Sequence, residues 1–218
     1  MNVEQARKIG MEVVEALAPA CDRIMIAGSV RRGKAQPKNI EIVYIPRLVP
    51  TRVDLFTTNQ VPAVGALVED LVRRRFWYFD DQVKRNGPRY KRMVRYTVLP
   101  ITSIHDFLDD EEEERIVIEL FRADRDNWGY ILALRTGPGD FNKVWAAKPW
   151  NMGCLPSDVA LKDGYLWRRG RPVPTPTEEE FFAQIGIPCW PPAERSAIHL
   201  AQFLLERRAR SGKPHTET

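Results

Sequence analysis

Two short apolar segments of the sequence each carry one carboxylate at their centre. The first is NIEIVYI, residues 39–45, which contains Glu41, and the second is IVIELF, residues 116–121, which contains Glu119. Their β-branched and apolar residues predict two buried strands, and alternation along the first places Asn39 and Glu41 on one face. If these strands are neighbours, the two carboxylates meet and can hold a hard divalent cation through oxygen ligands. Phosphoryl transfer needs such an ion. The simpler alternative is that the carboxylates lie on a sheet surface that faces solvent and bind no metal.

A glycine–serine pair stands just before the first of these strands. Residues 24–27 predict a short buried strand, and Gly28-Ser29 turns the chain into the basic segment VRRGK. A hydroxyl, backbone amides and guanidinium groups beside a sharp turn suit phosphate oxygens. Taken alone the pair is also typical of an ordinary turn, so its meaning depends on the strand that follows.

A basic segment lies between two further predicted strands, residues 76–79 and 92–98, with a turn at Asn86-Gly87-Pro88. Its cations alternate with tyrosines, a mixture that suits a nucleic-acid backbone and its bases. A solvated edge hairpin protected by charge is an equal alternative. The acidic run Asp109 to Glu114 predicts a solvated loop. The candidate DNA-contacting side chains of the basic segment are Lys84, Arg85, Arg89, Lys91 and Arg92.

Several predicted helices position these segments. Asn2 can cap a first helix that ends before Pro19, and an apolar stripe predicts a second helix over residues 61–74. Past a hinge at residues 124–129, the pattern predicts a helix capped by Asp126, a helix at 140–147, a hairpin turned at Asp163-Gly164, a short helix opening at Thr177 and a last helix over 193–208.

Composition predicts a globular protein with a sizeable core, since 44% of the 218 residues are hydrophobic. The net charge of +4 favours an anionic partner only weakly. No apolar run has membrane-spanning length and the N-terminal residues do not resemble a signal peptide, so a cytoplasmic location without membrane contact is expected. The three scattered cysteines fit reduced structural thiols better than bridges or metal ligands.

Five segments in order, GSVRRGK, NIEIVYI, VIELF, RTGPGDFNK and GIPCWPPAERS, resemble the family X DNA polymerases, the DNA polymerase beta-like nucleotidyltransferases. The chain looks most like small prokaryotic and phage members, and the resemblance extends from the first helix to about Arg195. The interval from Glu119 to Thr136-Gly137 matches the family's interval from its third metal-binding carboxylate to its threonine–glycine motif. This match favours Glu119 over Asp54 as a ligand.

The resemblance implies an α+β fold: a palm-like catalytic domain with a mixed sheet flanked by helices at residues 1–123, and a small nucleotide-selection subdomain at 124–210. Independently of the resemblance, the terminal residues 211–218 are expected to form a disordered tail. Asn39, Glu41 and Glu119 fall at the three metal-binding positions, for Mg²⁺ or Mn²⁺. The resemblance also implies that Gly28, Ser29 and Arg32 contact the triphosphate and that Thr136 and Gly137 contact the sugar. Asn142 and Lys143 would contact the nascent base pair. Both of these residues are expected on the exposed side of their helix.

The sequence departs from the family pattern at several of these positions. Asn39 and Glu119 replace aspartates, and Lys38 replaces a glycine that lets the backbone approach the phosphates. Leu134 and Arg135 replace the usual aromatic pair beside Thr136-Gly137. The substitutions at the metal positions remove one negative charge and lengthen one ligand by a methylene group.

The implied activity is that of a minimal, monomeric DNA-directed DNA polymerase in repair or replication. It would add a deoxynucleotide to a primer 3′-hydroxyl, with DNA and a deoxynucleoside triphosphate as partners. The resemblance also predicts a chain without the lyase and helix-hairpin-helix domains of larger members, and hence weak, salt-dependent DNA binding. One alternative is a catalytically weakened or inactive DNA- or nucleotide-binding relative. Another is a nucleotidyltransferase that uses a different acceptor.

Overall fold

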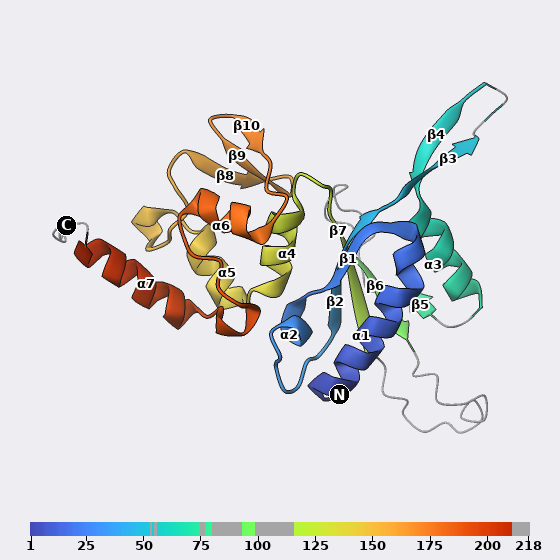
Figure 1. The fold of residues 1–218 in the computed structure, drawn as a ribbon, viewed down its shortest axis with the longest axis horizontal. Coiled ribbons are helices and arrows are strands. Elements are labelled where there is room, and N and C mark those ends of the chain that lie inside the picture. The colour runs from blue at the N-terminus through green and yellow to red at the C-terminus, as the bar shows by residue number, and fades with distance from the viewer. Residues whose placement is uncertain (53, 55, 75–76, 80–92, 99–115, 211–218) are drawn as a thin grey trace. The chain divides into compact units, whose positions relative to one another are not determined.

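Figure 1 shows the computed structural model of the protein, which describes residues 1–52, 54, 56–74, 77–79, 93–98 and 116–210. The chain divides into two compact units, Met1–Arg125 and Asp126–Thr218. Each unit contains both helices and β-sheet, so the chain belongs to the α+β class, as predicted. None of the described helices combines the length and the apolar character needed to cross a membrane.

The first unit is built around a five-stranded sheet in the order β1-β2-β7-β6-β5. The sheet is mixed, because β2 and β7 run parallel whereas the other neighbours are antiparallel. In chain order, the elements of this unit are α1 (Val3–Leu17), β1 (Cys21–Ile26), α2 (Gly28–Arg31), β2 (Ile40–Pro46), β3 (Leu48–Arg52), β4 (Thr58–Pro62), α3 (Ala63–Arg73), β5 (Trp77–Phe79), β6 (Met93–Val98) and β7 (Ile116–Arg122).

Helices α1 and α3 contribute to the core on one face of this sheet (Figure 1). Alternate residues of the two central strands are buried there, among them Ile40 and Ile42 of β2 and Ile118 and Leu120 of β7. Apolar helix stripes cover these residues and remove them from water, which is the main stabilising contribution of such packing. The intervening residues of both strands, including Glu41 and Glu119, therefore face the opposite side of the sheet.

Local signals at the start of the chain are confirmed. Asn2 caps α1, its side-chain oxygen accepting a hydrogen bond of 2.8 Å from the backbone N–H of Gln5, and the helix ends before Pro19. Strand β1 differs from the prediction, because it begins earlier, at Cys21, is exposed at Asp22 and Arg23, and is only half-buried at residues 24–26. Its position at the edge of the sheet explains the exposure, since an edge strand has a neighbour on one side only.

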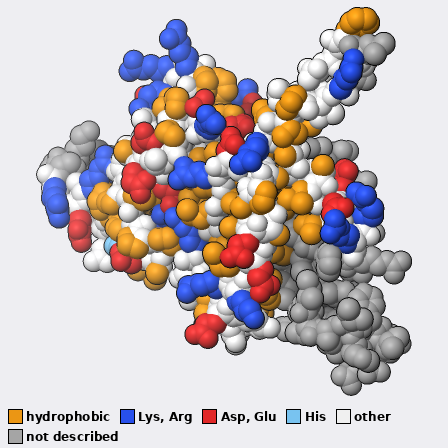
Figure 2. Space-filling model, turned by 45° about the vertical axis from the view of Figure 1, so that its right-hand side comes forward, with side chains coloured by type: hydrophobic (Ala, Val, Ile, Leu, Met, Phe, Trp, Pro, Cys, Tyr) orange, Lys and Arg blue, Asp and Glu red, His pale blue; other side chains and the backbone are white. Residues whose placement is uncertain are grey.

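A two-stranded ribbon, β3 and β4, follows the first central strand and was not predicted. Its register runs from Leu48↔Pro62 to Arg52↔Thr58, and the N–H of Ala63 donates to the carbonyl of Arg47 at its base. Every described residue from 48 to 61 is exposed except Val49, which is half-buried. Figure 2 shows the ribbon extending from the unit with hydrophobic side chains at its far end.

The second unit packs helices against a three-stranded antiparallel sheet in the order β10-β9-β8. Positive φ angles at Asp163 and Gly164 form the tight turn that the sequence predicts between the first two of these strands. In chain order, the elements are α4 (Trp128–Thr136), α5 (Gly139–Ala146), β8 (Val159–Lys162), β9 (Tyr165–Arg168), β10 (Arg171–Val173), α6 (Glu178–Ile185) and α7 (Ala197–Arg210).

Aromatic side chains fill the core of the second unit. Trp145 and Phe181 are fully buried and stack edge to face, with ring centroids 5.2 Å apart, and Tyr130 lies against both. Thr177 opens α6 with a capping box that Glu180 completes, as the predicted helix start at this threonine requires.

Several predictions fall outside the described residues. Besides the basic segment, they include the turn at Asn86-Gly87-Pro88, the acidic loop Asp109 to Glu114 and the tail 211–218.

Candidate metal and nucleotide site

The two strand carboxylates are direct neighbours across the centre of the sheet. In the parallel pair of β2 and β7, Glu41 is the register partner of Glu119, so both residues project from the same face. Glu119 is 7% exposed and Glu41 is half-buried. Two carboxylates side by side in a partly dry environment repel each other, and this repulsion favours a cation or a hydrogen-bond donor between them.

Asn39 supplies such a donor. It stands immediately before β2, and its Nδ2 donates a hydrogen bond of 2.8 Å to Oε2 of Glu119. A hydrogen bond to an ionised acceptor is stronger than one between neutral groups, so it offsets part of the cost of burying this carboxylate. The structure thus brings together in unit 1 the three residues that the sequence predicts as ligands.

The donor set of Asn39, Glu41 and Glu119 fits a hard divalent cation in kind, since Mg²⁺ and Mn²⁺ bind carboxylate and amide oxygens. Asn39 turns an N–H group toward Glu119, so its amide would have to rotate before its oxygen could face such an ion. Within the described ranges, no group of three or more histidine, cysteine, aspartate or glutamate side chains could hold a metal. The cluster of Asn39, Glu41 and Glu119 is consistent with that finding, because its third member is an amide and not a carboxylate.

The predicted phosphate turn lies directly against this cluster. Gly28 has a φ of +64°, and a Cβ atom added to it would lie 2.0 Å from Oε2 of Glu41. The backbone N–H of Ala27 also donates to the carbonyl of Glu41, at 2.7 Å. Glycine is therefore required at position 28 both for its backbone conformation and for the space that Glu41 occupies. Gly28 begins the single helical turn α2, in which Ser29 is half-buried, and Arg32, directly after this turn, is also half-buried.

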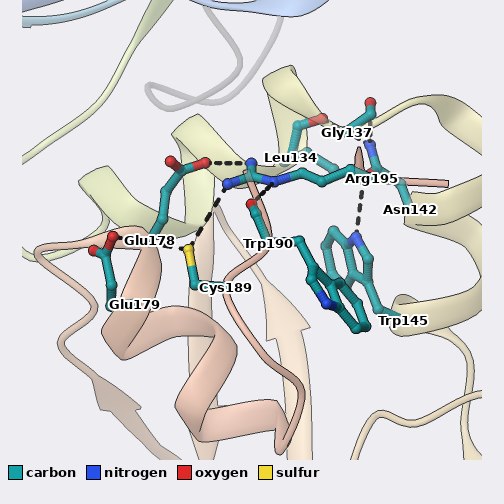
Figure 3. Close-up of polar contacts among 9 residues, drawn as sticks. All are labelled: Leu134, Gly137, Asn142, Trp145, Glu178, Glu179, Cys189, Trp190 and Arg195. Atoms are coloured by element: carbon teal, nitrogen blue, oxygen red, sulfur yellow. Dashed lines mark hydrogen bonds and ion pairs between the residues drawn. The ribbon is translucent and has the colours of Figure 1, made fainter. Parts of the chain in front are cut away.

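Thr136, Gly137 and Asn142 lie together in the second unit, at the junction of α4 and α5. Nδ2 of Asn142 donates to the carbonyls of Leu134, at 2.7 Å, and Gly137, at 3.1 Å, while its Oδ1 accepts from Nε1 of Trp145 at 2.9 Å (Figure 3). The prediction that Asn142 is exposed is wrong, because these bonds turn its half-buried side chain toward the end of α4.

The remaining predicted contacts fall into two groups. Lys143, next to Asn142 on α5, is exposed, as predicted. The basic residues Lys84, Arg85, Arg89, Lys91 and Arg92 lie outside the described residues, so their assignment to DNA stays a prediction.

Sequence reasoning missed a buried ion pair in the second unit. Nη1 of Arg195 lies 2.6 Å from Oε1 of Glu178, and the two side chains are 1% and 6% exposed (Figure 3). Nε of the same guanidinium donates to the carbonyl of Trp190 at 2.9 Å, and its Cζ lies 5.0 Å from the centre of the Phe182 ring. The sequence shows a charged helix start and a separate arginine, but no local pattern that links them.

Comparison with protein-family models gives no match to this chain, and comparison with curated proteins also gives none. A function is therefore inferred from the residues and their geometry, together with the sequence resemblance.

Proposed function

We propose that this protein is a minimal DNA-directed nucleotidyltransferase, which adds a deoxynucleotide to a primer 3′-hydroxyl. The observation that carries the proposal is the register of Glu41 with Glu119, with Asn39 bonded to the latter. The resemblance to family X DNA polymerases supports the same assignment, because these three residues match that family's metal-binding positions. We extend the proposal to the family's polymerase beta-like fold.

Each residue of the cluster has a distinct role in this proposal. Glu41 and Glu119 hold Mg²⁺ or Mn²⁺ through carboxylate oxygens, and Asn39 contributes its amide oxygen after rotation. When bound, the metal neutralises phosphate charge and favours ionisation of the primer hydroxyl. The hydroxyl would lose its proton to solvent and its oxygen would bond to the α-phosphorus, while the bond to the bridging oxygen would break and pyrophosphate would leave.

The Gly28-Ser29 turn and Arg32 would bind the triphosphate. A hydroxyl, backbone amides and a guanidinium group suit phosphate oxygens, and the contact of Gly28 with Glu41 keeps this turn next to the carboxylates. In the second unit, Thr136 and Gly137 would contact the sugar and Lys143 the nascent base pair. Asn142 would contact the base only by exchanging one of its internal hydrogen bonds.

Incorporation of a labelled deoxynucleotide tests the proposal. The substrates are primed, gapped and single-stranded DNA, each with Mg²⁺ and with Mn²⁺. Activity should need a primed or gapped template, should be abolished by Glu41→Gln, and should rise in Asn39→Asp, which restores a third carboxylate. Glu12→Gln, a change of the same type at an exposed position of α1, is the matched control and should leave activity unchanged.

A second candidate function is DNA or nucleotide binding without efficient catalysis. The hydrogen bond from Asn39 favours it, because an amide already satisfies one oxygen of Glu119 without any metal. In that case the wild-type protein binds DNA but incorporates no nucleotide under any of these conditions. Loss of both binding and incorporation would exclude both candidates.

A further inference from the structure

The β3–β4 ribbon exposes both of its faces to solvent. Leu48 pairs with Pro62 on one face and Val49 with Val61 on the other, and Leu48 and Val61 are 51% and 36% exposed. An isolated two-stranded hairpin is marginally stable in water, and hairpins usually bury one face against a core. A ribbon without such a face fits a role in contacting a partner.

The tip of the ribbon presents an aromatic ring. Phe56 is 97% exposed, the largest value among the exposed large hydrophobic side chains of the described residues. Asp54 fixes the backbone beneath it, since its Oδ1 accepts hydrogen bonds of 2.8 Å from the N–H groups of both Phe56 and Thr57. These bonds lower the pKa of the Asp54 carboxyl, which is consistent with a charged carboxylate that holds the tip in shape. The two bonds to Asp54 therefore hold the backbone at Phe56 and Thr57, while the ring itself lies in solvent.

Those residues of the ribbon that the structure describes offer little that suits a protein partner. Its exposed apolar residues Leu48 and Val61 lie on opposite faces, so they form no continuous patch. Pairing with the edge of a second copy is also disfavoured, because Pro50 interrupts β3 and offers no N–H to an incoming strand.

Nucleic acid fits these features better. A two-stranded ribbon has the width of a DNA groove, and an apolar or aromatic side chain at the tip of such an element can stack on or between bases. The exposed Arg52 adds a cation near the tip, its Nε donating to the backbone carbonyl of Asp54 at 3.1 Å. Thr51, Thr58, Asn59 and Gln60 add exposed hydrogen-bonding groups.

We infer that the β3–β4 ribbon is a DNA-contacting arm, in which Phe56 stacks on a base and Arg52 contacts a phosphate. The inference rests on the proposed function for its choice of DNA as the partner. It adds a contact that the predicted site residues do not include.

Fluorescence anisotropy of a labelled gapped duplex, measured over a salt series, tests the arm. Phe56→Ala should weaken binding roughly 5- to 150-fold, as expected for loss of one base–aromatic stack, without changing the salt dependence. Phe56→Trp should retain affinity. Arg52→Gln should reduce the slope of log affinity against log salt by about 1. Ile198→Ala removes another highly exposed apolar side chain, in α7, and should have no effect.

The outcomes separate the arm from the proposed function. Measurable binding by the wild type with no change in Phe56→Ala overturns the arm and leaves the nucleotidyltransferase proposal standing. Failure of the wild type to bind any DNA overturns both. If Phe56→Ala leaves DNA binding intact but abolishes a dimer in sedimentation velocity, the ribbon contacts a second copy of the chain and the DNA assignment is wrong.

Discussion

Asn39 donates its hydrogen bond to a carboxylate that lies 80 positions later in the chain, on Glu119. The amide thereby occupies an oxygen that the proposed function assigns to a metal. The same bond stabilises the protein without metal and opposes rotation of Asn39 toward a cation, so its removal should have opposite effects on stability and on metal response.

Asn39→Asp should destabilise the protein in the presence of a chelator. The variant loses a charge-assisted hydrogen bond and gains a third carboxylate beside Glu41 and Glu119, for an expected cost of about 1.5–3 kcal/mol. Thermal unfolding in EDTA should show the lower Tm. Added Mn²⁺ should raise the Tm of this variant more than that of the wild type. An unchanged Tm in EDTA would show that the Asn39–Glu119 bond contributes little.

Gly28→Ala should lower stability and activity much more than Gly33→Ala. Both glycines have positive φ angles, +64° and +72°, so both variants carry backbone strain of about 1–2 kcal/mol. Only the Cβ at position 28 meets another group, the Glu41 carboxylate, while position 33 has nothing within 4 Å. Urea unfolding should therefore separate the two variants, and only Gly28→Ala should lose activity through displacement of Glu41. Equal losses of stability would mean that Glu41 moves aside freely.

Removal of one partner of the buried Glu178–Arg195 ion pair should strongly lower the stability of the protein. Arg195→Met leaves the Glu178 carboxylate buried without its guanidinium, which typically costs about 3–5 kcal/mol. The double variant Glu178→Leu/Arg195→Met removes both charges and should recover much of that loss. Chemical denaturation of the two single variants and the double variant gives the coupling energy. Additive losses would show that the ion pair itself is not what stabilises this region.

Asn142→Ala should lower stability, whereas Lys143→Ala should not. The first variant leaves the carbonyls of Leu134 and Gly137 and the indole N–H of Trp145 without the partner seen in the structure, at a cost of about 1–3 kcal/mol. The second removes an exposed side chain one residue further on. Thermal unfolding compares them directly. A stable Asn142→Ala variant with altered nucleotide choice would instead support direct contact of Asn142 with the base.

The buried thiols predict an alkaline limit to stability. Burial raises the pKa of Cys21 and of Cys154 to about 11, from 9.0. The folded state therefore keeps both thiols protonated up to a higher pH than the unfolded state does. Their contribution to the free energy of unfolding is constant below pH 9 and is lost as the pH rises through 11. At pH 8.5, iodoacetamide should label both about a hundredfold more slowly than an ordinary thiol, because the thiolate is the nucleophile. Mass spectrometry after timed labelling checks this, with the denatured protein as reference.

Local patterns predicted most of the strands and helices, because the signals are local. The apolar run around Glu41, the Asn2 cap and the Asp163-Gly164 turn each depend on neighbouring residues. The pairing of Glu41 with Glu119 does not follow from local patterns, since strand neighbours far apart in sequence leave no local signal. The family resemblance, and not periodicity, selected Glu119 over Asp54.

Other features could not be read from sequence for physical reasons. The ribbon of β3 and β4 has prolines and no alternating apolar face, so it lacks the usual hairpin signal. Asn142 sits on a helix whose polar positions predict exposure, but its amide is turned inward by carbonyls at the end of the preceding helix. Side-chain direction at such a junction depends on tertiary packing, which a single sequence does not encode locally.

The parallel pairing of β2 with β7 also has a consequence for biosynthesis. As the chain leaves the ribosome, β2 emerges with its antiparallel neighbour β1 already made, but its other edge stays unpaired until β7 follows. More than half of the chain is synthesised before Glu119 can join Glu41. An unpaired apolar edge is prone to aggregation, so a chain that stops before β7 should depend on chaperones.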